Sequence, residues 1–177
     1  MPSTSSPEQA VSYDEDYVLW TEEQADMLMK GIFSALDIVN LVDEIQDLAR
    51  RYHHSLEHRL TVVLTHLLKC LMQPSRKSAS GSAVLLEQRK RIARLLKKNP
   101  SLIPFVGEYA ADNYLLAVAW ASAHTHLPPS RFPAENPFTI EQILDTSYEP
   151  WRCIKSPGGV PLIMHLPGGD HAIDIQL

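Results

Sequence analysis

Five polar side chains fall on or beside the apolar faces of two predicted helices, where they could do chemistry. They are Glu44, Arg59, His66, Lys69 and Gln88. In a pocket between the helices, His66 could act as a general base and Glu44 as its orienting or acidic partner. Arg59 or Lys69 could hold an anion there. The alternative is a buried network in which every polar group is hydrogen-bonded, because an unpaired group costs about 1–3 kcal/mol. The sequence favours the network, since Cys70 is the one nucleophile near His66, and such a cysteine usually belongs to the core.

Metal and phosphate motifs are missing from the chain. His54 and His58 stand four residues apart, a spacing that suits metal ligands, but they lie on the outward side of their predicted helix. No glutamate has a histidine three residues after it, as a carboxylate-bridged metal pair requires. The spacings GxxxxGK and GxGxxG are absent, and Cys70 and Cys153 form no CxxC motif. We therefore expect no metal site and no cofactor.

A basic segment is the clearest surface feature. Residues 76–98 carry eight basic residues against one acid, whereas residues 8–49 carry eleven acids against one base. The basic residues are Arg76, Lys77, Arg89, Lys90, Arg91, Arg94, Lys97 and Lys98. They could follow a phosphate backbone, although the segment has no interleaved aromatic residues for base stacking. The alternative is a solvated helix face that pairs with the acidic first third of the chain.

Local signals predict the helices that must position these residues. A capping box that begins at Thr21 opens a short helix, which Gly31 can close in the left-handed conformation. Asp37 is placed to cap a long helix over residues 37–72, which stops before Pro74. Further helices are predicted over residues 80–98, capped by Ser80 or Ser82, and over residues 102–124 and 139–145.

These elements predict an all-α fold, a helical bundle around one long central helix. A short C-terminal β-hairpin, pairing residues 160–166 with 172–177, or an irregular tail follows it. The expected organisation is a disordered N-terminal tail (1–12), a helical bundle domain (13–150) and a C-terminal extension (151–177).

Composition narrows the class of protein. The chain has 177 residues, of which 45% are hydrophobic, and a formal net charge of -5. This apolar fraction is too high for a disordered chain. The N-terminus lacks the basic and apolar regions of a signal peptide, and no apolar stretch is long enough to span a membrane. We expect a cytoplasmic protein with no membrane partner.

Residues from about 13 to 150 resemble a bacterial family called "domain of unknown function 29". The ordered matches include Tyr17-Val-Leu-Trp20-Thr, Leu36-Asp37, Asn40-Leu41, Glu44-Ile45, Leu56-Glu57, Arg59-Leu60, His66-Leu-Leu-Lys69, Gln73-Pro74, Glu87-Gln88-Arg89, Pro100-Ser101-Leu102, Phe132-Pro133 and Pro137-Phe138-Thr139-Ile140-Glu141-Gln142. The resemblance implies an all-helical bacterial protein and supplies no activity. The chain departs from the family at Ser82, where members usually carry an aromatic residue, and in the tail after Trp151.

Three functions remain open. The first, which the missing catalytic motifs favour, is a non-catalytic protein-interaction domain with a partner that the sequence does not identify. The second is a nucleic-acid-associated protein that uses the basic segment at 76–98. The third is an enzyme with a polar pocket around His66.

Overall fold

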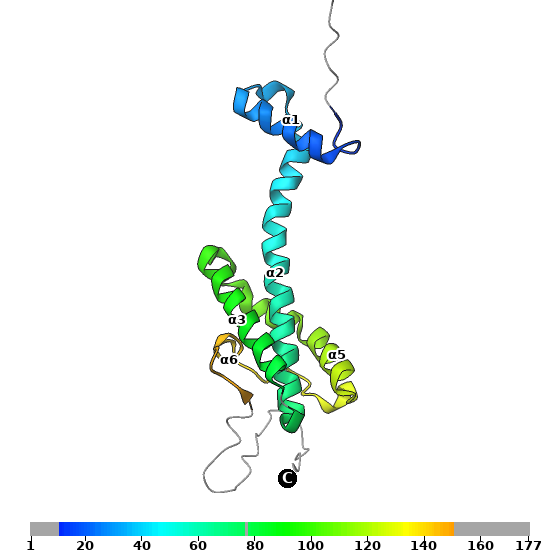
Figure 1. Cartoon of the computed structure of the whole chain (residues 1–177), viewed down its shortest axis with the longest axis vertical. Coiled ribbons are helices and arrows are strands. Elements are labelled where there is room, and N and C mark those ends of the chain that lie inside the picture. The colour runs from blue at the N-terminus through cyan, green and yellow to red at the C-terminus, as the bar shows by residue number, and fades with distance from the viewer. Residues whose placement is uncertain (1–10, 77, 151–177) are drawn as a thin grey trace, which may run out of the picture. The chain divides into compact units, whose positions relative to one another are not determined.

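The computed structural model describes residues 11–76 and 78–150, and every regular element in these ranges is a helix (Figure 1). The predicted all-α fold class is therefore confirmed. The predicted hairpin, residues 1–10 of the predicted N-terminal tail, and Lys77 lie outside the described residues.

The described residues form two compact units, divided in the chain between Arg51 and Tyr52. This division falls inside the range 13–150 that the sequence predicts as one domain. The long helix α2 (Ile38–Met72) supplies its first part to unit 1 and its second part to unit 2.

Unit 1 contains α1 (Tyr17–Lys30), the 3₁₀ helix η1 (Phe33–Ala35) and the first turns of α2. Asp16 caps α1 by accepting a hydrogen bond from the Leu19 N–H at 3.0 Å. The predicted start at Thr21 is therefore wrong: the Thr21 hydroxyl lies one turn inside the helix and donates to the Tyr17 carbonyl at 2.7 Å. Gly31 closes the helix with φ of 72°, as predicted.

The few buried groups of unit 1 connect α1 to the start of α2. Trp20 and Gln24 are the two buried residues among the described residues of this unit. The Gln24 side-chain oxygen accepts from the Asp37 N–H at 2.8 Å. Asp37 in turn accepts from the Asn40 N–H at 3.3 Å and from its side-chain amide at 2.6 Å, which agrees with its predicted role at the start of α2.

Unit 2 is built around the second part of α2, which α3 and α5 flank on opposite sides (Figure 1). Its elements are α3 (Ala79–Lys98), α4 (Phe105–Asp112), α5 (Tyr114–Thr125), α6 (Ile140–Leu144) and the 3₁₀ helices η2 (Pro74–Arg76), η3 (Pro100–Leu102) and η4 (Pro129–Arg131). Leu60 and Leu67 of α2 are fully buried in one core with Ile92 of α3, Ala117 of α5 and Ile143 of α6.

Two predicted helix boundaries in unit 2 are corrected by the structure. Ser78, rather than Ser80 or Ser82, caps α3 and accepts from the Gly81 N–H at 3.0 Å. The helix predicted over residues 102–124 is divided into α4 and α5 at Asn113, whose side-chain amide donates to the Tyr109 carbonyl at 3.0 Å. Asparagine interrupts helices in this way because its side chain competes for backbone groups.

None of the helices in residues 11–76 and 78–150 combines the length and the apolar character that a bilayer-spanning segment requires.

Candidate functional site

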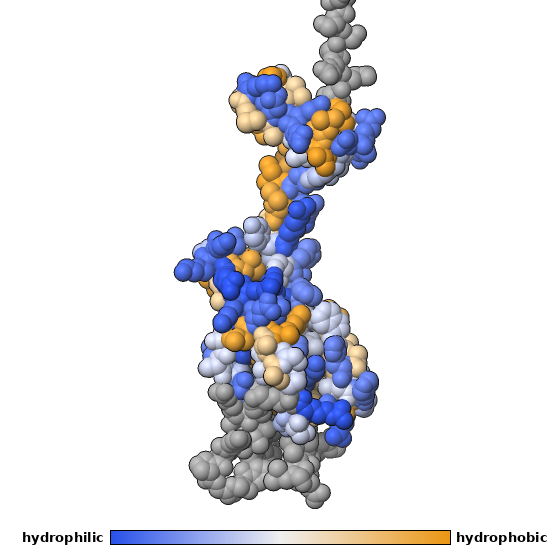
Figure 2. Space-filling view, in the orientation of Figure 1, coloured by the Kyte–Doolittle hydropathy of each residue, from blue (hydrophilic) through white to orange (hydrophobic). Residues whose placement is uncertain are grey.

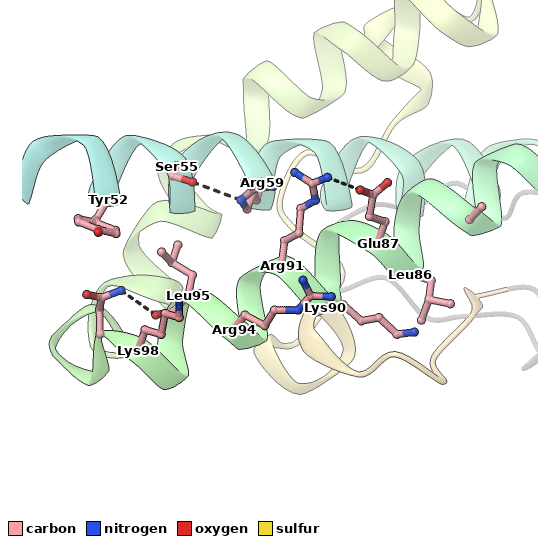
Figure 3. A pocket seen from close by; sticks show the side chains of 12 residues that line it. Tyr52, Ser55, Arg59, Leu86, Glu87, Lys90, Arg91, Arg94, Leu95 and Lys98 are labelled. Atoms are coloured by element: carbon pink, nitrogen blue, oxygen red, sulfur yellow. Dashed lines mark hydrogen bonds and ion pairs between the residues drawn. The ribbon is translucent and has the colours of Figure 1, made fainter. Parts of the chain in front are cut away.

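A groove of about 610 Å³ lies between α2 and α3 in unit 2 (Figure 3). We call it the basic groove, because five of its lining residues are cationic and one is acidic. The cations are Arg59, Lys90, Arg91, Arg94 and Lys98, and the acid is Glu87; Tyr52, Ser55, Ala83, Leu86, Leu95 and Asn99 complete the lining.

The helical repeat of α3 sets the spacing of the cations. Lys90, Arg94 and Lys98 follow at intervals of four residues, so they share one face with about 6 Å of rise between neighbours. All three side chains are exposed, and within residues 11–76 and 78–150 none of them forms an ion pair. Arg91 pairs with Glu87 one turn earlier on the same helix. One wall of the groove therefore carries an excess of positive charge.

Arg59 supplies a cation from α2, on the other wall. Its guanidinium donates to the Gln88 side-chain oxygen at 2.9 Å and to the Ser55 hydroxyl at 3.2 Å. Partial burial lowers the pKa of Arg59, and the neighbouring positive charge of Arg91 lowers it further. Arg59 and Gln88, which the sequence grouped with His66, thus belong to the basic groove, where Gln88 orients the arginine.

Arg89 is not part of this surface, although the sequence placed it in the exposed basic set. Its side chain is buried, and it donates to the carbonyls of Gln142 at 2.6 Å, Ile143 at 2.8 Å and Tyr148 at 2.8 Å. The first two carbonyls belong to α6, a five-residue helix whose last carbonyls have no partners inside the helix. Arg89 therefore holds α6 and the following turn against α3, which is a structural role.

Two further members of the predicted basic set, Arg76 and Lys97, lie outside the basic groove. Lys97 is exposed on α3 but does not line the groove, and Arg76 lines a second, smaller cavity.

His66 lines this second cavity, which measures about 80 Å³ and also includes Lys69, Cys70 and Gln73. Burial lowers the pKa of His66 to about 4, with smaller contributions from the charges of Lys69 and His124. The imidazole is consequently neutral near pH 7. A group with so low a pKa is a weak general base at that pH, because efficient bases have a pKa near the working pH.

Glu44 does not join His66. It belongs to unit 1, where its carboxylate accepts hydrogen bonds from the hydroxyls of Tyr13 at 2.6 Å and Tyr17 at 2.8 Å. These two bonds lower the pKa of Glu44. The five predicted candidates are thus distributed among three places: Glu44 in unit 1, Arg59 and Gln88 at the basic groove, and His66 and Lys69 at the small cavity.

In the described part of the chain, no group of three or more histidine, cysteine, aspartate or glutamate side chains is placed to hold a metal ion.

A different kind of surface lies on unit 1. Twelve of the seventeen large apolar residues that are exposed in the described ranges belong to this unit. They are Tyr17, Val18, Leu19, Leu28, Met29, Ile32, Phe33, Ile38, Val39, Val42, Ile45 and Leu48. Figure 2 shows such apolar side chains over α1 and over the first turns of α2. The structure leaves the residues of α2 among them in contact with solvent.

Ile38, Val42, Ile45 and Leu48 form what we call the apolar stripe of unit 1, because intervals of three and four residues place them on one face of α2. Ile45 is 64% exposed and Leu48 is 54% exposed. Residues 11–51 contain ten carboxylates and three basic side chains, so the unit that carries the stripe has an excess of negative charge. Unit 1 is therefore both apolar and strongly acidic at its surface.

Comparison with known proteins identifies a family and no individual relative. The family described as "domain of unknown function DUF29" matches residues 12–149. No curated protein and no solved structure matches the chain.

Proposed function

We propose that this chain, which belongs to the family of domains of unknown function DUF29, is a non-catalytic protein-interaction domain. In this proposal, unit 1 binds a partner protein. The observation that carries this proposal is the concentration of exposed apolar side chains on unit 1. A bacterial cytoplasmic location is part of the proposal, because a sequence with two cysteines and no CxxC motif lacks the pattern of a disulfide framework and suits a reducing compartment.

The ratio of exposed to buried apolar residues in unit 1 supports binding to a partner that covers the exposed ones. Trp20 is the one large apolar side chain that unit 1 buries among its described residues, whereas twelve are exposed. Monomeric proteins rarely leave large contiguous apolar patches in water. Covering a side chain such as Ile45 or Leu48 completely contributes about 1.5–3 kcal/mol, so several together stabilise a complex.

The charge of unit 1 indicates the chemistry of the partner. Three carboxylates, those of Asp43, Glu44 and Asp47, lie on the same helix turns as the apolar stripe. A partner surface that is complementary has an apolar face bordered by Lys and Arg. An amphipathic helix with a basic border combines these features, and helices of this kind dock on apolar surfaces through residues at three- and four-residue intervals.

A pair of synthetic peptides tests this proposal. The first is an amphipathic helix of about 18 residues, long enough to be helical, with leucine on one face and lysine on the other. The second replaces every lysine with glutamate. We expect the wild-type protein to bind the lysine peptide more tightly in fluorescence anisotropy titrations, because both the apolar and the charged contacts are then favourable.

Matched variants locate the binding surface. The double variant Ile45→Ser/Leu48→Ser removes two exposed residues of the apolar stripe, and Leu115→Ser removes one on α5 that is 73% exposed. We expect at least about tenfold weaker binding of the lysine peptide for the first variant, a loss of about 1.4 kcal/mol, and no change for the second. Equal affinity for the two peptides, no binding of the lysine peptide, or an equal loss in both variants would overturn the proposal.

A further inference from the structure

We infer that the basic groove of unit 2 binds the sugar-phosphate backbone of single-stranded nucleic acid, independently of the partner proposed for unit 1. The two surfaces lie in different units and have opposite charge. Residues 11–51 carry seven more acidic than basic side chains, whereas residues 52–150 carry three more basic than acidic ones. A polyanion is therefore attracted to unit 2 although the whole chain has a net charge of -5.

The side chains in the groove suit a ligand with several phosphates. Lys90, Arg94 and Lys98 form a row along α3 in which no member has an acidic partner within the described ranges. Glu87 is engaged by Arg91, so it does not neutralise the row. Arg59 reaches the groove from α2 and is oriented by Gln88 at 2.9 Å. Cations on both walls can neutralise successive phosphates and release their counterions.

The groove also contains an aromatic side chain that the basic segment itself lacks. Tyr52 of α2 lines the groove and is 49% exposed. Single strands bind in positively charged grooves where bases stack on exposed aromatic rings, and a base in a duplex has no free face for this contact. Tyr52 therefore favours a single strand over a duplex, and over an acidic peptide, which has no base to stack.

The test is a titration of the full chain with a fluorescently labelled single-stranded oligonucleotide of about 20 nucleotides, longer than one groove occupies. A duplex of the same sequence and a polyglutamate peptide are titrated in parallel. The protein variant is Arg94→Gln/Lys98→Gln, in which both changed residues are exposed, so we expect little change in stability. The control is Arg76→Gln/Lys97→Gln, which removes two exposed cations outside the groove and has the same net charge.

We expect the wild type to bind the single strand in preference to the other two ligands. Each lost phosphate contact lowers affinity about fivefold at 0.1 M salt, so the groove variant should bind about 25-fold more weakly, and its salt slope should fall by about 1.4. The control variant should lose less than about threefold. Tyr52→Ala should weaken single-strand binding about tenfold without changing the salt slope, because stacking involves no counterion.

Four results would overturn the inference. They are the absence of single-strand binding even at low salt, an equal loss in the groove and control variants, an affinity for polyglutamate as high as for the single strand, and an affinity for the duplex as high as for the single strand. None of these results bears on the peptide experiment with unit 1, so the two proposals can fail separately.

Discussion

The two units use the same helix in opposite ways. In unit 2, the second part of α2 buries its leucines against four other helices, and the core extends from Leu56 to Ile143. In unit 1, the first part of α2 leaves Ile38, Val42, Ile45 and Leu48 exposed. The comparison shows that an apolar stripe at helical spacing does not by itself indicate a core, because burial depends on what the rest of the chain places against it.

Charge separates the two units as clearly as burial does. Unit 1 combines exposed apolar residues with an excess of acidic side chains, whereas five cations of unit 2 line a groove that has a single acid. Unit 2 has the larger core and a network of buried hydrogen bonds. The stability of unit 1 depends on the buried residues Trp20 and Gln24. We therefore expect substitutions in the two units to differ in how much of the molecule they affect.

The largest expected effect is that of Arg89→Ala in unit 2. The substitution leaves three carbonyls, of Gln142, Ile143 and Tyr148, without their donor. We expect a loss of about 3–5 kcal/mol in the free energy of unfolding, measured by urea denaturation, because each carbonyl that loses this donor costs about 1–3 kcal/mol. Arg89→Lys should recover little of it, since one ammonium group cannot reproduce the guanidinium fork.

Lys90→Ala is the control for Arg89→Ala, because Lys90 is the next residue on α3 and is exposed. It should change stability by less than about 0.5 kcal/mol. Similar losses for Lys90→Ala and Arg89→Ala would contradict the structural role of Arg89.

The next effect is that of Trp20→Ala, which removes the one large buried apolar side chain of unit 1. Such a truncation costs about 3–5 kcal/mol in a well-packed core. Unit 1 has little other burial, so we expect it to lose its hydrogen-exchange protection while the amides of unit 2 keep theirs.

Phe33→Ala provides the comparison within unit 1, because Phe33 is 67% exposed and its removal should leave the protection pattern unchanged. If Trp20→Ala also removed the hydrogen-exchange protection of the amides in α3 and α5, this result would show that the two units unfold together.

The smallest effect is a pH dependence that comes from His66. The pKa of His66 is about 4 in the folded chain, below the ordinary value of 6.5. Between these two pH values the unfolded chain binds a proton that the folded chain does not. His66 therefore destabilises the fold as pH falls from about 6.5 to about 4, and this penalty is absent above pH 6.5.

His66→Gln should remove this component, so that the difference in unfolding midpoint between about pH 7 and about pH 5 becomes smaller than in the wild type. His54→Gln, a substitution at an exposed position, is the control. An NMR titration of His66 with a midpoint near 6.5 would contradict the explanation directly.

Sequence signals predicted those parts of the fold that depend on neighbours in the chain. The stop before Pro74, the closure at Gly31 and the short helix that follows Thr139 are all confirmed. The capping box at Thr21 was wrong because Asp16, five residues earlier, starts the helix first. The division at Asn113 was not predicted, since an isolated asparagine within a helical pattern is a weak signal.

The candidate site could be predicted only in part. The basic character of residues 89–98 was visible from the sequence, and four of those cations line the groove. That Arg59 also lines the groove could not be predicted from the sequence, because this depends on how α2 and α3 face each other. Glu44 was assigned to His66 on helical phase, but its partners Tyr13 and Tyr17 come from a segment that precedes α2.

The sequence by itself determined the all-α class, the extent of the long helix and the contrast between an acidic first third and a basic segment, because each of these depends on local capping, periodicity and composition. Tertiary structure alone decided which apolar and charged side chains are buried. Arg89 and Lys90 are neighbours in the chain, yet one binds three carbonyls more than fifty residues away and the other lines an open groove. The physical reason is that a buried charge requires partners at fixed positions, and only the folded chain brings those partners together.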